Sequence, residues 1–244
     1  MTKRSQRGVT LLELLIAITL MSLLSGGILY GLRVGLTALE KTNNRFLANR
    51  RVLGVDRALQ QQLAGLIPVG ATCLGPDGAP GGKTRYFQGE PQAMRFLTNY
   101  SLNEAARGFP RLVEYSVIPG ENNQGVRLIV NETIYTGPTS LMGQCLGFRM
   151  DPARGLPIPL FRPVQAGAGS FVLADRLAAV RFVFQEKMPA PQPPRWVPVW
   201  SAPAWPLAIR IEITPADANA GSLDVTTVTV PVRVNAEPFK QYAD

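Results

Sequence analysis

Hydrophobic residues form one long run at the start of the chain, and a single charged side chain interrupts it. From residue 9 to residue 32 the sequence is mostly apolar, with Glu13 as its one charge. About 24 such residues form a helix of roughly 36 Å, which is enough to cross a hydrocarbon core of about 30 Å. The run therefore predicts a transmembrane helix over residues 9–32.

A stripe of apolar residues at helical spacing continues beyond this run. Its members are Leu32, Leu36, Leu39, Phe46, Leu53, Leu59, Leu63 and Leu66. Lys41, Arg51 and Gln61 take other faces, as in an amphipathic helix with one buried side. We therefore expect an amphipathic stem helix over residues 33–67, whose outer half packs against the rest of the protein.

After Pro68 the pattern changes to alternating residues with frequent glycine and proline. Short alternating runs predict strands at Ala93–Thr98, Arg111–Ile118, Gly125–Tyr135, Ala179–Glu186, Arg195–Trp200, Leu207–Thr214 and Asp224–Val234. Turn residues predict a loop over residues 75–83, and prolines predict long connections over 151–163 and 189–206. The fold class is therefore α+β, with a long amino-terminal helix packed on an antiparallel β domain of residues 69–244.

The residues before the apolar run form a basic leader that ends in glycine. Lys3, Arg4 and Arg7 precede Gly8, and the apolar run with Glu13 follows. An ordinary secretory signal lacks a carboxylate in its apolar stretch and ends in an A-x-A-like site, which is not evident here. An unpaired charge in a bilayer core costs about 2.5 to 3.5 kcal/mol or more, so Glu13 needs a partner.

This arrangement resembles the type III signal of type IV pilins and pseudopilins. The resemblance implies that a prepilin peptidase removes residues 1–8, cutting between Gly8 and Val9, and methylates the new amino terminus. It also implies that Glu13 is the glutamate that serves in assembly. Val9 stands where the family usually has phenylalanine.

Basic residues on both sides of the predicted span leave its orientation in the membrane open. The peptidase resemblance implies a single-pass inner-membrane protein with its carboxyl-terminal domain in the periplasm.

Glycines recur on one face of the predicted span. Gly27, Gly31 and Gly35 lie four residues apart, with Gly26 beside them. Small residues at this spacing let a second helix approach closely in lipid. Each glycine also weakens the helix by about 0.8 to 1 kcal/mol relative to alanine, so a stretch that extends on assembly is the other interpretation. Both interpretations suit a protein that assembles.

Composition excludes several classes of function. The formal charge is +8, but residues 69–244 carry sixteen basic and fourteen acidic groups, so no nucleic acid is expected as a partner. The chain has no histidine, which removes Ser-His-Asp and Cys-His catalysis. Glu186 and Glu212 lie on separate predicted strands and can meet there, but strand glutamates are usually solvated. We expect no enzyme activity.

Two further residue sets leave alternatives open. Oxygen ligands are available from Asp77, Glu121, Asn122, Asn123, Asp217 and Asp224. Their spacing is not that of an EF-hand loop, so we expect no metal or other cofactor, although some of the pseudopilins that this chain resembles bind calcium.

Cys73 and Cys145 lie beyond the span. In an oxidising periplasm they can form a disulfide, or each can be a small core residue.

The carboxyl half carries a narrower resemblance. The segments LADRLAAVRFVFQE, WPLAIRIEIT and VTTVTVPVRV, together with Trp196, Trp200 and Trp205, resemble the J-type minor pseudopilin of type II secretion systems. That family pairs a long helix with two antiparallel sheets. The resemblance implies assembly with I-type and K-type minor pseudopilins and the major pseudopilin. The tryptophans are then either a partner surface or core residues.

Two other functions compete with this interpretation. A W-type minor pilin of a type IV pilus shares the signal and a related layout. A membrane-tethered binding or hydrolytic domain would use the span only as an anchor. Substitution of Glu13 separates the tethered module from an assembly subunit, and the gene neighbourhood separates a secretion operon from a pilus operon.

Overall fold

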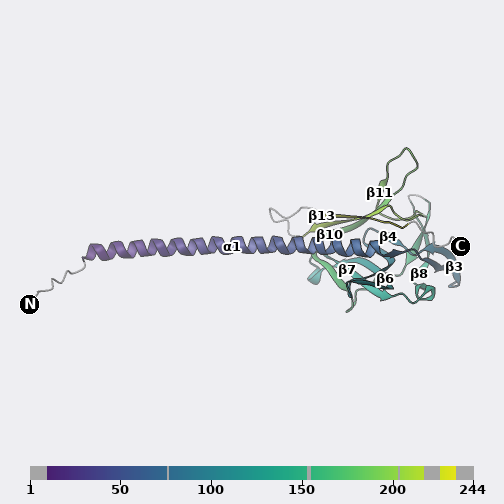
Figure 1. Ribbon diagram of the computed structural model, residues 1–244, viewed down its shortest axis with the longest axis horizontal. Coiled ribbons are helices and arrows are strands. Elements are labelled where there is room, and N and C mark those ends of the chain that lie inside the picture. Colours follow the sequence, from purple (N-terminus) through teal and green to yellow (C-terminus); the bar gives the residue numbers. More distant parts are fainter. Residues whose placement is uncertain (1–9, 76, 153–154, 203, 217–225, 235–244) are drawn as a thin grey trace, which may run out of the picture. The chain divides into compact units, whose positions relative to one another are not determined.

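The computed structural model begins with one long helix, α1, Leu11–Ala64 (Figure 1). The structure describes residues 10–75, 77–152, 155–202, 204–216 and 226–234, and the side chains of 41–53 and 226 lie outside this description. Two compact units are distinguished, Met1–Asn49 and Arg50–Asp244. The helix contributes residues to both units, which are described separately below.

The helix ends at a glycine that touches the sheet. A Cβ atom at Gly65 would lie 2.4 Å from the Asn99 side-chain oxygen, so no larger residue fits without displacement of that side chain. The next two residues form strand β1 (Leu66–Ile67), which pairs antiparallel with β5 (Ala93–Ser101). The predicted stem helix over 33–67 is therefore wrong in its last three residues, because backbone pairing with β5 replaces helical bonds there.

The last turns of α1 pack into the core of the second unit. Val55, Leu59 and Leu63 are buried at helical spacing, whereas Gln60 and Gln61 are exposed. The stripe predicted from the sequence is confirmed where side chains are described in this unit. Burial of one face explains why the helix continues beyond the apolar run.

Further strands follow the helix along the chain. In addition to β1 and β5 they are β2 (Gly70–Leu74), β3 (Pro80–Arg85), β4 (Gln88–Glu90), β6 (Ala106–Pro119), β7 (Val126–Ile134), β8 (Cys145–Met150), β9 (Pro157–Phe161), β10 (Phe171–Glu186), β11 (Arg195–Val197), β12 (Ala208–Pro215) and β13 (Thr226–Pro231). Two 3₁₀ turns, η1 (Glu121–Asn123) and η2 (Pro138–Leu141), lie between them.

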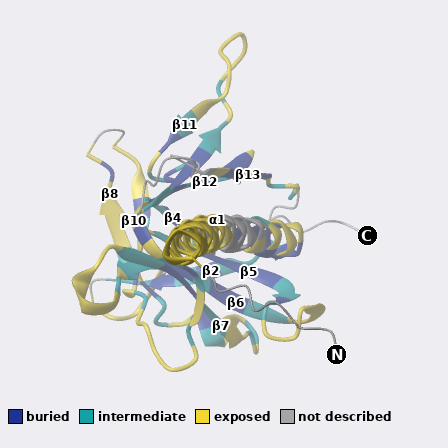
Figure 2. Ribbon diagram, turned by 90° about the vertical axis from the view of Figure 1, so that its left-hand side faces the viewer, coloured by how far each residue is buried: buried dark blue, intermediate teal, exposed yellow. Residues whose placement is uncertain are grey.

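These strands form one nine-stranded antiparallel sheet and two small sheets. The large sheet has the order β1-β5-β6-β7-β10-β12-β13, with β4 on β5 and β11 on β10; the small sheets are β2-β3 and β8-β9. Strand β10 joins the two halves of the large sheet, because residues 171–177 pair with β7 and residues 177–185 pair with β12. The last turns of α1 lie between these halves (Figure 2). The α+β class, pilin-like, is confirmed.

Each predicted strand has a counterpart in the structure, although Asp224 and Val225 of the last one lie outside the described residues, and other strands lie where none was predicted. Residues 80–83 of the predicted loop belong to β3, and residues 157–161 of the predicted connection belong to β9. Both expectations were wrong for these residues. Each segment is rich in glycine or proline but pairs with a neighbouring hairpin strand, so tertiary pairing overrides local propensity.

Two buried clusters hold the second unit together. The larger lies between α1 and the helix-facing side of the large sheet and includes Phe96, Tyr115, Phe182 and Ile211. The smaller lies beneath the two hairpin sheets; its members are Ala71, Cys73, Tyr86, Leu97, Leu112, Leu141, Cys145 and Phe161. The large sheet is therefore covered on both faces over part of its area, by the helix on one side and the hairpins on the other.

Candidate functional site

The predicted cleavage residues, Gly8 and Val9, lie outside the described residues. The next predicted residue, Glu13, lies in the first turn of α1 and is exposed. Its backbone N–H donates to Thr10 Oγ1 at 3.3 Å, and the Thr10 N–H donates to Glu13 Oε2 at 3.5 Å. This is the reciprocal arrangement of a capping box, in which each side chain satisfies a backbone donor at the helix start.

The capping box gives the Glu13 carboxylate a local partner. A negative charge in the first helical turn also interacts favourably with the helix dipole. Neither interaction neutralises the charge, because the Thr10 N–H is a neutral donor. Sequence reasoning missed this contact, although the T-x-x-E spacing of Thr10 and Glu13 was visible.

Most of the first unit presents apolar side chains outward. The segment Leu11–Glu40 is long and apolar enough to cross a membrane. Its most apolar stretch has a mean hydropathy of 2.1, and 0% of that stretch is buried. Leu11 is 83% exposed and Leu23 is 74% exposed. About 30 residues of helix span roughly 45 Å, more than a hydrocarbon core of about 30 Å. This surface needs lipid or other helices to cover it.

The glycines of this segment face open space. A Cβ atom added at Gly26, Gly27, Gly31 or Gly35 would meet no heavy atom within 4 Å. Nothing within the described chain therefore requires glycine at these positions. A packing role for Gly27, Gly31 and Gly35 would have to come from another helix.

Some hydroxyl groups in the same segment bond to carbonyls of their own helix. Thr19 donates to the Ile16 carbonyl at 2.9 Å, and Ser22 donates to the Ile18 carbonyl at 2.8 Å. Such bonds remove the need for an outside partner in lipid. Glu13 remains the one charged side chain between residues 10 and 32. It is the group of this segment for which a charged outside partner matters most.

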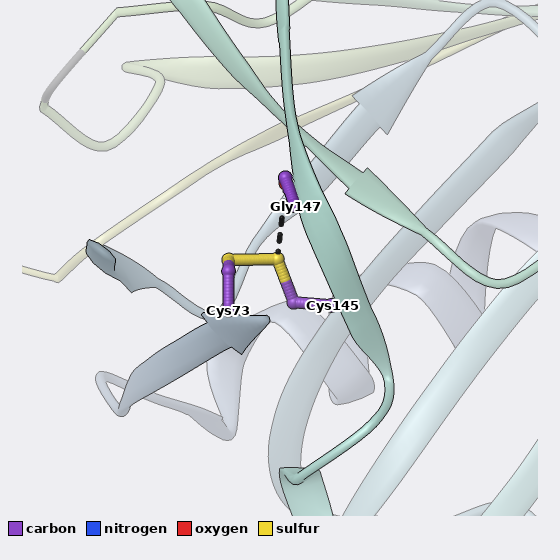
Figure 3. Close-up of a disulfide and its surroundings, with 3 residues drawn as sticks. All are labelled: Cys73, Cys145 and Gly147. Atoms are coloured by element: carbon purple, nitrogen blue, oxygen red, sulfur yellow. Dashed lines mark hydrogen bonds between the residues drawn. A yellow bond between two sulfur atoms is a disulfide. The ribbon is translucent and has the colours of Figure 1, made fainter. Parts of the chain in front are cut away.

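The structure joins Cys73 and Cys145 in a disulfide (Figure 3). Both residues are fully buried, and the bond links β2 to β8 within the smaller core cluster. Cys145 Sγ also lies 3.5 Å from the carbonyl oxygen of Gly147. A bridge across a sequence separation of 72 stabilises by about 4 kcal/mol in the chain-entropy model. The two hairpin sheets are thereby tied together.

The carboxylates considered for catalysis do not meet. Glu186 Oε2 lies 2.9 Å from Arg195 Nε, and Glu212 Oε2 lies 2.8 Å from an Arg181 nitrogen. Because Glu212 pairs in register with Arg181, it lies five residues along β10 from Glu186. Each carboxylate is therefore engaged by a different arginine.

The oxygen ligands considered for metal binding do not form a cluster in the described structure. No group of three or more Cys, Asp or Glu side chains is arranged for a metal among the described residues. Glu121 instead pairs with Arg127, which also contacts Asp175 at 2.9 Å. This contact lowers the pKa of the Asp175 carboxyl and raises that of the Arg127 guanidinium. Asp217 and Asp224 lie outside the described residues.

The tryptophans belong mainly to the core. Trp200 is 7% exposed, lies against Phe184 and donates its ring N–H to the Ala204 carbonyl at 3.0 Å. Trp205 packs edge-on against Phe87. The Arg210 guanidinium lies over the Trp196 ring, with its central carbon 3.9 Å from the ring centroid. Core packing thus accounts for two of the three, and a cation–π contact engages the third.

A buried polar network fixes the end of α1 on the sheet. Gln62 is fully buried; its amide donates to Glu132 Oε1 at 2.8 Å, and its side-chain oxygen accepts from the Tyr115 hydroxyl at 2.5 Å. Glu132 also accepts from Ser101 Oγ at 3.0 Å. Burial raises the pKa of the Tyr115 hydroxyl, and Glu132 adds to this shift. No sequence pattern indicates this network, because a glutamine on an amphipathic helix usually faces solvent.

The comparison with known families concerns the amino terminus. Residues 3–29 match the family described as the prokaryotic N-terminal methylation motif. No curated protein matches the chain. The matched residues include Gly8, Val9 and Glu13, so the motif and the pilin-like fold together indicate a type IV pilin-like protein. The motif implies processing by a prepilin peptidase and assembly with other pilin-like subunits.

Proposed function

We propose that this protein is a J-type minor pseudopilin, which assembles with other minor pseudopilins at the tip of a type II secretion pseudopilus and supports protein export. The observation that carries the proposal is the methylation motif over residues 3–29, which overlaps the exposed apolar helix segment Leu11–Glu40. Its partners are the I-type and K-type minor pseudopilins and the major pseudopilin. Its role is structural rather than enzymatic.

The mechanism follows from the position of Glu13. Before assembly its carboxylate has the neutral Thr10 N–H as a partner. In an assembly, the free ammonium of a neighbouring subunit's processed amino terminus can approach and neutralise it. Desolvation of both charges limits the net gain, so the ion pair specifies register more than it adds stability. The open glycine face at Gly27, Gly31 and Gly35 gives the neighbouring helix a place to pack.

The J type is supported by the carboxyl half of the chain. The three segments that carry the resemblance form β10, β12 and β13, which are consecutive in the large sheet. A buried disulfide suits an oxidising compartment, which supports an inner-membrane anchor with the second unit in the periplasm. A W-type minor pilin would share the signal and the compartment, so partner identity must separate the two.

Substitution of Glu13 tests whether the protein is an assembly subunit. We expect Glu13→Ala to insert in the membrane but to fail to enter the pseudopilus and to abolish export. Glu40→Ala is the matched control, because Glu40 is an exposed carboxylate on the same helix outside its first turn. Wild-type assembly by the Glu13→Ala protein would contradict the proposal and favour a tethered module.

Two measurements complete the test. Mass spectrometry of the mature protein should find Val9 as the amino-terminal residue, with one added methyl group. An intact start at Met1 would contradict a pilin-like role altogether. Copurification with I-type and K-type pseudopilins is expected; copurification with type IV pilus subunits would instead assign the W-type function.

A further inference from the structure

Strand β13 forms one end of the nine-stranded sheet. It pairs with β12 along Thr226–Pro231, and no described residue pairs with its other edge. Figure 2 shows β13 beside β12 at the end of that row of strands. A strand edge with unpaired N–H and C=O groups is a template for another strand.

The register shows which backbone groups face this free edge. Pro231 lies opposite Ala208 and has no N–H, so these two residues cannot form a hydrogen-bonded pair. Since the two kinds of pair alternate along an antiparallel ladder, Val228 and Val230 exchange bonds with β12. The N–H and C=O groups of Thr227 and Thr229 therefore point away from β12, toward the free edge.

The core holds this edge in place. Val228 and Val230 are each 4% exposed and belong to the larger core cluster. Thr227 and Thr229 alternate with them and are exposed on the opposite face. The outward backbone groups are thus presented by a strand that packing already holds in extended form, which reduces the conformational entropy that binding would cost.

Several other described edge strands carry features that discourage pairing. Strands β1, β4 and β11 have two or three residues each. Strand β9 contains Pro157 and Pro159, and β3 begins at Pro80 and contains Lys83. Short strands, prolines and lysines are devices that protect a sheet edge. Residues 226–231 carry no charge, their one proline comes last, and the rest are threonine or valine.

We propose that the free edge of β13 docks an extended strand of a neighbouring pilin-like subunit. Backbone donors and acceptors at Thr227 and Thr229 recognise an extended segment whatever its sequence, and their side chains favour β-branched neighbours across the new pair. The proposal rests on the proposed function, since it assigns a surface to the same assembly. It adds a contact outside the membrane to the one made by the helix.

Amide-resolved hydrogen exchange tests the edge. The probes are the pilin-like subunits that copurify with this protein, each purified and mixed with the full-length chain in detergent. In the chain alone the Thr227 and Thr229 amides should exchange freely, whereas those of Val228 and Val230 should be protected. With one of the subunits, exchange at Thr227 and Thr229 should slow by about tenfold or more.

A proline substitution tests the same edge by affinity. Thr229→Pro removes an outward donor without removing a bond to β12, so the unfolding midpoint should stay near that of the wild type. Binding of the subunit should weaken by about tenfold or more. Thr229→Val keeps the N–H and the branched shape, and its affinity should stay within about twofold of the wild type. Should Thr229→Pro fail to fold, Thr227→Pro and the exchange measurement on the wild-type chain carry the test.

Several outcomes would overturn the proposal. Protection of Thr227 and Thr229 in the isolated chain would mean that the chain covers its own edge. Wild-type affinity of Thr229→Pro, or no protection by any subunit, would show that partners bind elsewhere. Failure of the edge is distinguishable from failure of the proposed function: in the first case Glu13→Ala still blocks assembly, and in the second it does not.

Discussion

The two halves of α1 have opposite environments although they belong to one helix. Leu23 in the first unit is 74% exposed, whereas Leu59 in the second is fully buried. In the last turns of the helix, the face that carries Val55, Leu59 and Leu63 is covered by the sheet of its own chain. The first half has no cover among the described residues, so its apolar surface must be explained by something outside the chain, such as lipid or neighbouring helices.

Polar groups differ between the units in the same way. Hydroxyls of the first unit, such as that of Ser22, bond to carbonyls of their own helix. In the second unit Gln62 bonds to Tyr115 and Glu132, which come from two different strands. Such hydroxyls of the first unit therefore need no outside hydrogen-bond partner, as expected for a helix in lipid, whereas the apolar side chains around them are exposed. In the second unit the chain buries its own apolar core, and tertiary contacts satisfy the Gln62 side chain.

Loss of the disulfide should have the largest effect, and it should be confined to the second unit. The double variant Cys73→Ser, Cys145→Ser removes a bridge worth about 4 kcal/mol in the chain-entropy model. All three tryptophans lie in the second unit, so their fluorescence in a urea titration reports its unfolding. The helical signal of the first unit should persist. An unchanged urea midpoint would show that the hairpins do not depend on the bridge.

Paired leucine substitutions test the contrast directly. Leu59→Ala creates a cavity in the larger core and should lower the free energy of unfolding by about 2 to 5 kcal/mol. Leu23→Ala removes the same atoms from an exposed position and should leave the unfolding of the second unit unchanged. Comparable losses in the two variants would show that the first unit is also packed against its own chain.

The buried network at Gln62 should contribute less than the apolar core. Tyr115→Phe removes the hydroxyl that donates to the Gln62 side-chain oxygen and leaves that acceptor buried. The expected loss is about 1 to 3 kcal/mol by urea unfolding. Tyr100→Phe is the control, because Tyr100 is only half-buried and its hydroxyl is not part of the Gln62 network described above. Equal stability of the two variants would mean that water replaces the lost donor.

The elements predicted correctly are those whose local pattern agrees with their tertiary role. The alternation of Ile209, Ile211 and Ile213 with polar residues predicted β12, because one face of that strand is buried against the core. Strands β2 and β3 were missed, since their glycines and prolines favour turns. They are held as strands by mutual pairing and by the Cys73 disulfide, which no local pattern encodes.

The residues of the candidate site also differ in whether the sequence alone could identify them. Glu13 could be identified because an ionised carboxylate within an apolar run is costly in lipid unless a charged partner neutralises it. The local Thr10 contact was readable from spacing but was overlooked. Gln62 could not be found, because its burial depends on strands more than thirty residues away in sequence. The outward edge of β13 likewise depends on its register with β12.

The smallest expected effect concerns the ion pair between Arg127 and Asp175 at the surface of the second unit. Hydrogen bonding to Arg127 lowers the pKa of the Asp175 carboxyl in the folded state. Its stabilising contribution is therefore present above the pKa of the unfolded chain, near 4, and is lost as pH falls through the lower folded value. Asp175→Asn should lower the unfolding midpoint at pH 7, by less than Tyr115→Phe does, and the difference from wild type should vanish in acid.

Salt should also reduce the difference in unfolding midpoint between Asp175→Asn and the wild type, because Asp175 is 34% exposed. A difference that persisted at low pH and high salt would mean that Asp175 acts through its bond to the Arg176 backbone N–H rather than through its charge.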